Sequence, residues 1–169
     1  MASYLITGRS GTGKSTVCKE LLKRGYVAFD GDSVPGLAGW VDIATGQKVN
    51  TDYPGHDHVG KFNWNWDETV LKKLLQDNED VFLCGSANNA YNFYPLFDTV
   101  FVLNLEPDEQ RRRINNRVEH DYGKDLAVQD SIIAYQKESV EVARNRGATI
   151  VDSMPPVDQI VSDILSRIK

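Results

Sequence analysis

A segment near the amino terminus has the residue types and spacing of a phosphate-binding loop. Gly8-Arg9-Ser10-Gly11-Thr12-Gly13-Lys14-Ser15 matches the pattern G-x-x-x-x-G-K-[ST] at every fixed position. Glycines let the backbone curl so that several N–H groups point at one phosphate, and the following helix adds its dipole. The lysine of this pattern reaches the β- and γ-phosphate oxygens, and the final hydroxyl ligates Mg²⁺. We therefore expect residues 8–16, Thr16 included, to bind ATP, with Lys14 catalytic and Ser15 a metal ligand.

The competing glycine pattern does not fit. The dinucleotide fingerprint G-x-G-x-x-G would begin at Gly11 and would need a glycine where Thr16 stands. Nicotinamide and flavin cofactors are therefore not expected. The sequence has no guanine-reading Asn-Lys-x-Asp motif, and the choice between ATP and GTP as phosphate donor stays open.

Charged side chains follow two of the expected strands. Asp30 and Asp32 flank Gly31 directly after the apolar run 26–29. Phosphoryl transfer needs mostly positioning and charge neutralisation, and a carboxylate near the acceptor can orient or deprotonate its hydroxyl. Arg113 and Arg117 are four residues apart, which would place them on one face of a helix.

The elements around the loop have the order that such a site needs. Residues 4–7 form a short apolar run ending at Gly8, and apolar residues recur at helical spacing over 14–24. Further strands are expected at 26–29, 81–84, 99–105 and 148–151. Helices are expected from Asp67, a capping residue, to 75, over 108–117 with Pro107 in the first turn, over 126–146, and from 157 to 168. Strands alternating with helices predict an α/β fold with a parallel sheet.

One long segment has no regular pattern. Residues 34–65 are rich in glycine and aromatic residues, and so long an irregular stretch is usually functional or mobile. Trp40, Trp64 and Trp66 either form a wall for a bound molecule or pack the segment onto the sheet. The run His56-Asp57-His58 lacks a third and fourth ligand at zinc spacing, so we do not expect a metal there.

Length and charge restrict the class of protein. The chain has 169 residues, 19 lysines and arginines, 24 aspartates and glutamates, and a net charge of -5. This size suits a single domain, and an acidic chain lacks the basic stripe that nucleic-acid binding requires. No signal peptide and no run of about 18 apolar residues is present, so we expect a cytoplasmic protein that does not contact membranes. Cys18 and Cys84 are expected to be reduced, buried thiols.

The whole chain resembles the small P-loop kinases, the group that contains shikimate, gluconate, adenylylsulfate and nucleoside monophosphate kinases. The resemblance is carried by the phosphate-binding loop, by Asp30-Gly31-Asp32, by Arg113-Ile114-Asn115-Asn116-Arg117, and by the polar segment 118–125. It implies a P-loop nucleoside triphosphate hydrolase fold of the nucleotide-kinase type, with a five-stranded parallel sheet flanked by helices. It further implies one domain over 1–169, a short lid at 118–125, and an acceptor-binding insert at 34–65.

The resemblance also implies a role for each charged residue. Asp32 would orient or deprotonate the acceptor, and Asp30 would hold Mg²⁺ through water; an ordinary acidic turn is the alternative. Arg113 would lie near the adenine, and Arg117 would act on the phosphates in catalysis, unless both belong to a solvated face. Lys124 in the lid is a weaker phosphate ligand.

One segment departs from the family pattern. Nucleoside monophosphate kinases typically have an acidic Asp-Gly-containing motif after the third strand, where this chain has Cys84-Gly85-Ser86-Ala87-Asn88-Asn89. Gly85 would allow close approach of an acceptor, and the polar residues at 86, 88 and 89 would bind its hydroxyls, or the segment is only a turn.

The expected activity is transfer of the γ-phosphate of ATP, with Mg²⁺, to a small-molecule acceptor. This acceptor is a hydroxylated metabolite, a nucleoside or a nucleoside monophosphate, and the protein is a monomer or a homodimer. The alternative is an ATP-binding switch or assembly factor that hydrolyses ATP slowly.

Overall fold

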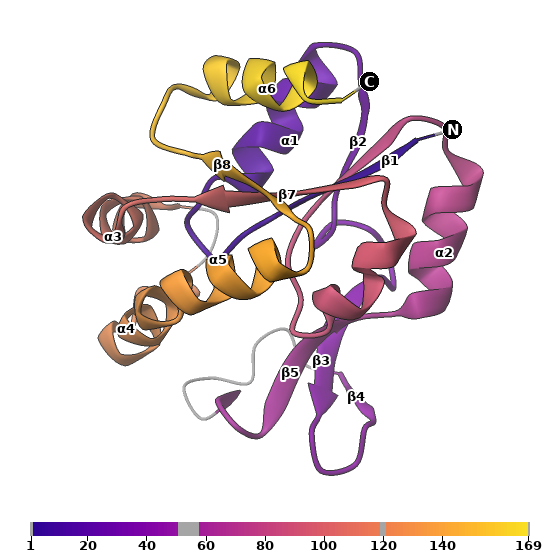
Figure 1. Ribbon diagram of the computed structural model, residues 1–169. Coiled ribbons are helices and arrows are strands. Elements are labelled where there is room, and N and C mark those ends of the chain that lie inside the picture. The colour runs from indigo at the N-terminus through magenta and orange to yellow at the C-terminus, as the bar shows by residue number, and fades with distance from the viewer. Residues whose placement is uncertain (1, 51–57, 119–120, 169) are drawn as a thin grey trace.

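The computed structural model describes residues 2–50, 58–118 and 121–168, which form a five-stranded parallel sheet with helices on both faces (Figure 1). In spatial order the strands are β2 (Val27–Asp30), β6 (Val81–Cys84), β1 (Ser3–Thr7), β7 (Thr99–Asn104) and β8 (Thr149–Asp152). All neighbouring strands pair in parallel. The expected fold class is therefore confirmed, and each expected strand lies within one residue of its predicted bounds.

Alternate residues of the central strand β1 face different helices. Tyr4 and Ile6 pack with α1 (Lys14–Lys23) and α6 (Val157–Ser166). Leu5 packs on the other face with α2 (Glu68–Asp77), the 3-10 helix η2 (Ala90–Leu96) and α5 (Gln136–Asn145). The sheet is thus buried on both faces, as a parallel sheet requires, and α1 and α6 lie together on one side in Figure 1.

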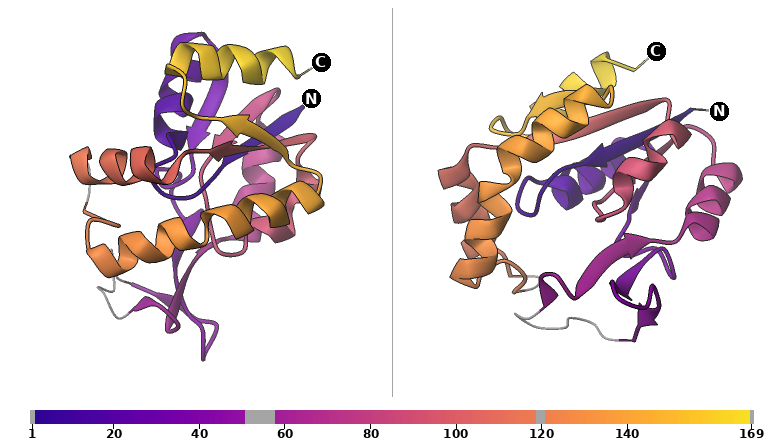
Figure 2. Two further views of the ribbon diagram at one scale, coloured as in Figure 1. Left: turned by 60° about the vertical axis from the view of Figure 1, so that its left-hand side comes forward. Right: turned by 60° about the horizontal axis from the view of Figure 1, so that its bottom comes forward.

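The insert is more regular than its sequence pattern indicated. It contains β3 (Ala38–Asp42), β4 (Lys48–Val49) and β5 (Phe62–Trp66), which form an antiparallel sheet in the order β4-β3-β5. The expectation of an irregular segment is therefore wrong for these residues. Trp40 lies directly opposite Trp64, and cross-strand aromatic pairs of this kind stabilise strands that contain glycine and asparagine. Figure 2 shows this small sheet projecting to one side of the main sheet.

The helix expected over 126–146 is interrupted. Two helices, α4 (Leu126–Ala134) and α5, meet at Tyr135. Val128 and Ile132 of α4 pack against Ile114 of α3 (Pro107–Asn116), whereas Val140 of α5 packs on the main sheet. The two helices therefore pack in different hydrophobic clusters, an effect of tertiary packing that the periodicity of the sequence does not indicate.

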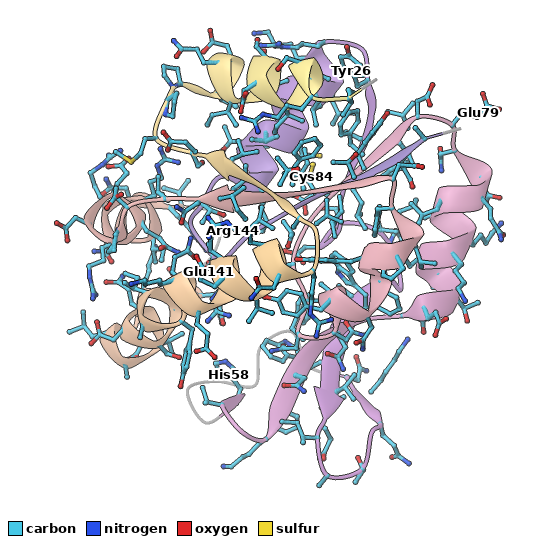
Figure 3. The ribbon with its side chains drawn as sticks, in the orientation of Figure 1. Tyr26, His58, Glu79, Cys84, Glu141 and Arg144 are labelled. Carbon is cyan, nitrogen blue, oxygen red and sulfur yellow. The ribbon has the colours of Figure 1, made fainter. Side chains whose placement is uncertain are left out.

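Several smaller expectations are confirmed. The Asp67 side chain accepts hydrogen bonds from the backbone N–H groups of Thr69 and Val70 at the start of α2, and Pro107 opens α3. Cys18 and Cys84 are free and buried, and Figure 3 labels Cys84 within the main sheet. Within the described ranges, no helix is both long enough and apolar enough to cross a membrane.

Candidate active site

The phosphate-binding loop joins β1 to α1 and needs its glycines for space and for backbone shape. Gly8, Gly11 and Gly13 have φ angles of 148°, 85° and 102°, which side chains rarely adopt. A Cβ atom at Gly8 would lie 2.8 Å from the backbone oxygen of Leu103, and one at Gly11 would lie 2.7 Å from Cγ1 of Ile114. The loop is therefore a backbone cradle pressed against its neighbours.

Lys14 folds back over this loop. Its Nζ donates hydrogen bonds to the backbone oxygens of Gly8 (2.9 Å) and Arg9 (3.1 Å). Burial lowers the pKa of Lys14 to about 8, although the nearby carboxylate of Asp32 acts in the opposite direction. The Nε atom of Arg9 is buried and has no hydrogen-bond partner among the described residues. A loop of this shape with one ammonium and one unpartnered guanidinium N–H fits the phosphates of a nucleotide.

The two carboxylates lie where β2 ends. The Asp30 Oδ1 atom accepts a hydrogen bond from the backbone N–H of Asp32 (3.1 Å), which shapes the turn. The side chain of Asp32 also takes part in a hydrogen bond: its Oδ1 accepts from Nε1 of Trp64 (3.2 Å). Asp32 is thus held between the turn after β2 and strand β5 of the insert.

Arg113 and Arg117 lie at the carboxyl-terminal end of α3 and line the cavity beside the loop. Arg113 lies on α3, where its Nε donates to Glu109 Oε1 (2.9 Å) and its Nη2 donates to the backbone oxygen of Ser153 (2.9 Å). Arg117 is the residue that caps the carboxyl end of α3, with a φ of -69° and a ψ of 142°, so the helix ends one residue earlier than expected. Its Nη2 donates to Oγ of Ser10 (3.1 Å) and its Nη1 to the backbone oxygen of Tyr122 (3.4 Å). Arg117 therefore connects the loop to the segment expected to be the lid.

The remaining arginines of α3 and Lys124 of the segment 118–125 have acidic partners. Arg111 pairs with Asp130 at 2.7 Å, and Arg112 pairs with Glu109 at 2.7 Å. Lys124 donates to Oδ1 of Asp121 at 2.9 Å.

The segment after β6 anchors the insert. The Oδ1 atom of Asn88 accepts from the backbone N–H of Trp64 (2.8 Å). Asn89 accepts from the N–H of Trp66 and donates to its backbone oxygen, both at 2.9 Å. A Cβ atom at Gly85 would lie 3.1 Å from Cζ2 of Trp66. The indole of Trp66 therefore fills the space beside Gly85, where we expected an acceptor to approach. The Asn89 side chain binds the backbone of Trp66, where we expected it to bind the acceptor.

Aromatic rings extend from the insert toward the lid. The rings of Trp40 and Trp64 are 5.2 Å apart, and the His58 ring, labelled in Figure 3, lies 5.3 Å from Trp40 and 5.9 Å from Tyr122. His56 and Asp57 lie outside the described residues. In the described part of the chain, no three His, Cys, Asp or Glu side chains form a group that could hold a metal ion.

One cavity of about 1910 Å³ joins all these elements. Lys14, Asp30, Asp32, Arg113 and Arg117 all line it, together with residues 8–11, 13, 15 and 16 of the loop region. Thr12 is fully buried beneath the loop, where its Oγ1 donates to the Arg9 oxygen at 2.8 Å.

Several cavity residues were not singled out from the sequence, and two of them carry polar side chains that contact the elements of the site. Gln136 begins α5, and Ser153 follows β8 and donates to the backbone oxygen of Thr12. Ser153 stands at the carboxyl end of a parallel strand, a position that points to the site edge of the sheet. Gln136 carried no such signal, because the sequence predicted an uninterrupted helix there.

The parallel sheet, the glycine loop after β1 and the lysine at the start of α1 define a P-loop nucleoside triphosphate hydrolase fold of the nucleotide-kinase type. The family model described as "AAA domain" matches residues 5–146, and the chain belongs to this family.

Solved structures of small-molecule kinases share the fold. A shikimate kinase from Acinetobacter baumannii in complex with shikimate has a TM-score of 0.67 at 14% identity, covering 100% of this chain and 96% of its own. A deoxyadenosine kinase from M. mycoides with bound dATP has a TM-score of 0.58 at 15% identity, covering 98% of both chains. A gluconokinase from Sinorhizobium meliloti 1021 has a TM-score of 0.52 at 19% identity, covering 98% of this chain and 90% of its own. No curated protein matches the chain by sequence.

Proposed function

We propose that the chain is a phosphotransferase that uses ATP and Mg²⁺ to phosphorylate a small molecule. The observation that carries the proposal is that Lys14 and Asp32 line the same cavity, with the Asp32 charge raising the pKa of Lys14 against the effect of burial. A cation for the phosphates and a carboxylate for the acceptor hydroxyl are the two groups that this reaction needs close together. The likeness to solved kinases supports the proposal through the fold alone.

The residues of the loop and of α3 act on the donor side. The backbone N–H groups of residues 8–16 hold the phosphates, and Lys14 neutralises charge on the β- and γ-phosphate oxygens. The Ser15 hydroxyl and, through water, Asp30 would hold Mg²⁺, which would neutralise phosphate charge when bound. Arg113 lies toward the adenine, and Arg117 adds a planar, bidentate donor to the phosphates.

Asp32 acts on the acceptor side. The acceptor hydroxyl oxygen forms a bond to the γ-phosphorus, and the bond from this phosphorus to the β–γ bridging oxygen breaks. The hydroxyl proton passes to the Asp32 carboxylate, and ADP leaves with the electron pair of the broken bond. The indole of Trp64 orients the carboxylate for this step through its hydrogen bond at 3.2 Å.

We further propose that residues 1–169 work as one domain in which the insert 34–65 binds the acceptor and the segment 118–125 acts as a lid. The contact of 5.9 Å between the rings of His58 and Tyr122 supports this arrangement, because it joins the insert to the lid segment across the cavity. Closure of such a lid excludes water and so favours transfer over hydrolysis.

The test is a screen for acceptor-stimulated release of ADP. Purified protein with Mg-ATP is given nucleosides, nucleoside monophosphates, sugar acids and cofactor precursors in turn, and phosphorylated products are identified by mass. The proposal expects at least one compound to raise ADP release well above the basal rate, and Lys14→Ala to abolish this effect. Slow release of ADP that no compound accelerates would favour an ATP-binding switch or assembly factor instead.

A further inference from the structure

The charges that line the cavity are divided between its two sides. All of its lysines and arginines come from the phosphate-binding loop, α1, α3 and the residue that ends α3: Arg9, Lys14, Lys19, Arg112, Arg113 and Arg117. A second group of lining residues lies on the turn after β2, on the insert, on the segment from β6 to η2, and on α4 and α5. We call this the acceptor side.

The described residues of the acceptor side include no lysine or arginine. Its formally charged members are the carboxylates of Asp32 and Glu138, and Asp30 lies beside it at the end of β2. Residues 51–57 and 119–120, whose structure is not described, contain no lysine or arginine in the sequence. An acceptor that carries a phosphate or a carboxylate would therefore enter beside like charges without a cationic partner.

The cost of removing an anion from water disfavours an anionic acceptor in this cavity. Moving a carboxylate or phosphate out of water costs more than a neutral group does unless a cation or several N–H donors receive it. Sites that bind such groups usually provide arginine, whose planar fork matches their oxygens. In this cavity Arg113 donates to Glu109 and to the backbone of Ser153, and Arg117 donates to Ser10 and to the backbone of Tyr122. Neither arginine belongs to the acceptor side.

The same side carries an aromatic cluster that ends at the reactive carboxylate, in which Trp64 is partly exposed whereas Trp40 and His58 are each 7% exposed. Trp40 and Trp64 meet edge to face with centroids 5.2 Å apart, and His58 continues the row 5.3 Å from Trp40. The indole of Trp64 donates to Asp32, so a ring that contacts this row lies close to the carboxylate. Flat heterocycles stack favourably on such side chains without any charge of their own.

One buried amide supplies a polar contact. Gln136 is 5% exposed and lines the cavity, and its Nε2 donates to Oδ1 of Asn104 at 3.0 Å. Its Oε1 is buried and has no hydrogen-bond partner among the described residues. A buried carbonyl oxygen without a hydrogen-bond partner is stabilised by an N–H or O–H donor, and it repels a phosphate or carboxylate oxygen.

Resting on the proposed kinase function, we infer that the acceptor is an uncharged, hydroxyl-bearing ring compound of the nucleoside class. Its ring packs on Trp64, whose indole is supported by Trp40. A ring or hydroxyl donor binds Gln136 Oε1, and its hydroxyl faces Asp32. The hydroxyl takes the γ-phosphoryl group from ATP, its proton goes to Asp32, and ADP leaves. Nucleoside monophosphates and sugar acids are poor acceptors for this site.

Matched pairs of compounds that differ in charge test the inference on the unmodified chain. The pairs are adenosine with AMP, cytidine with CMP, guanosine with GMP, thymidine with dTMP, and sorbitol with gluconate, each followed by ADP release and product mass. We expect one nucleoside to have a kcat/KM at least about ten-fold above that of its monophosphate and of both sugar compounds, which corresponds to roughly 1.4 kcal/mol.

Each other result overturns a different statement. If a monophosphate or gluconate is the better acceptor, the uncharged class is wrong while the kinase proposal stands. If sorbitol is the best acceptor, the aromatic row does not bind a ring. If no compound accelerates ADP release, both the kinase proposal and this inference fail.

The variant Gln136→Met tests the amide separately. It keeps the volume of the side chain and removes the carbonyl, so the KM for the nucleoside should rise about ten-fold or more while the KM for ATP stays constant. Gln159→Met, on the exposed surface of α6, is the matched control and should change neither constant. A nucleoside KM that is equal in Gln136→Met and in the unmodified chain would remove Gln136 from the binding site.

Discussion

The indole Nε1 of Trp64 donates a hydrogen bond of 3.2 Å to Oδ1 of Asp32. Trp64 belongs to the insert, and Asp32 follows β2 of the main sheet, so this bond joins the two sheets at the carboxylate. A hydrogen bond to an ionised group is stronger than one between neutral groups, and it fixes the orientation of the carboxylate. The position of the insert thereby sets the geometry of the acceptor side.

Trp64→Phe should lower kcat by about ten-fold, because it keeps the aromatic surface and removes a donor to a charged group, a contact typically worth about 1.5–3 kcal/mol. The measurement is a double-mutant cycle with Asp32→Asn. In the Asp32→Asn background, Trp64→Phe should have little further effect on kcat. Equal losses in both backgrounds would show that the indole acts independently of Asp32.

Asp32→Asn and Asp30→Asn should differ in what they impair. Both keep the side-chain volume, and asparagine at 30 retains the oxygen that accepts from the backbone N–H of Asp32. Asp32→Asn should depress phosphoryl transfer far more than ATP affinity, whereas Asp30→Asn should raise the Mg²⁺ concentration needed for half-maximal rate. Calorimetry with ATP and rates over a Mg²⁺ series measure the two effects. Equal loss of ATP affinity in both variants contradicts this division of roles.

The lowered pKa of Lys14 predicts a pH dependence of ATP capture. Burial brings the pKa of this ammonium down to about 8 in the free protein, so the positive charge is present below this pH and is lost above it. The kcat/KM for ATP should therefore fall as the pH rises through about 8, since this constant reports the free enzyme. With saturating ATP, kcat should hold to higher pH, because bound phosphates favour the charged amine.

Lys14→Arg provides the control for this profile. Arginine stays charged throughout the accessible pH range, so the variant should be slower but should lack the decline near pH 8. A kcat/KM profile of the unmodified chain that is flat to about pH 9.5 would show that Lys14 does not lose its proton in this range.

The main sheet and the phosphate-binding loop were predictable because their signals are local. Gly8, Gly11 and Gly13 are required by backbone conformation, and the buried strands read as short apolar runs between glycines. The same holds for Asp67, whose carboxylate caps α2 within three residues. Nothing distant in the sequence is needed to recognise these features.

The contacts that build the acceptor side were not predictable, because they join residues that are far apart in the sequence. Asn89 binds the backbone of Trp66 across 23 positions, and the Asp32 bond to Trp64 spans 32. The break at Tyr135 arises because α4 packs on α3 while α5 packs on the sheet, and this break places Gln136 at the cavity. These contacts depend on the assembled fold, and no periodicity in the sequence indicates them.

Arg117→Lys should remove most of the activity. Arg117 donates to both Ser10 Oγ and the Tyr122 oxygen, and a single ammonium cannot replace a planar fork that spans the loop and the lid segment. We expect kcat to fall about 100-fold with a smaller change in the KM for ATP, a loss typical for one donor to the transition state. Arg111→Lys on α3, whose partner is Asp130, is the control and should keep full activity. A kcat for Arg117→Lys that matches the unmodified chain would remove Arg117 from the transition state.

Two tryptophans of β5 should separate stability from acceptor binding. Trp66 is 3% exposed and packs against Gly85 and Gly31, whereas Trp64 contacts Trp40 and Asp32 in the cavity. Trp66→Ala should therefore lower the free energy of unfolding by about 3–5 kcal/mol, the range for a buried aromatic residue. Trp64→Ala should lower it less and should raise the KM for the acceptor, because the surface that it removes faces the bound molecule.

A denaturant melt and a kinetic titration of both variants measure these effects, and fluorescence adds a direct readout. All three tryptophans of the chain lie on β3 and β5, at 40, 64 and 66, so tryptophan emission reports on the small antiparallel sheet alone. The acceptor, added with a non-hydrolysable ATP analogue, should shift the emission of the unmodified chain and of Trp66→Phe, and should shift that of Trp64→Phe less. If Trp64→Ala costs as much stability as Trp66→Ala and leaves the acceptor KM unchanged, Trp64 serves only to pack the insert, and the aromatic row is not a binding surface.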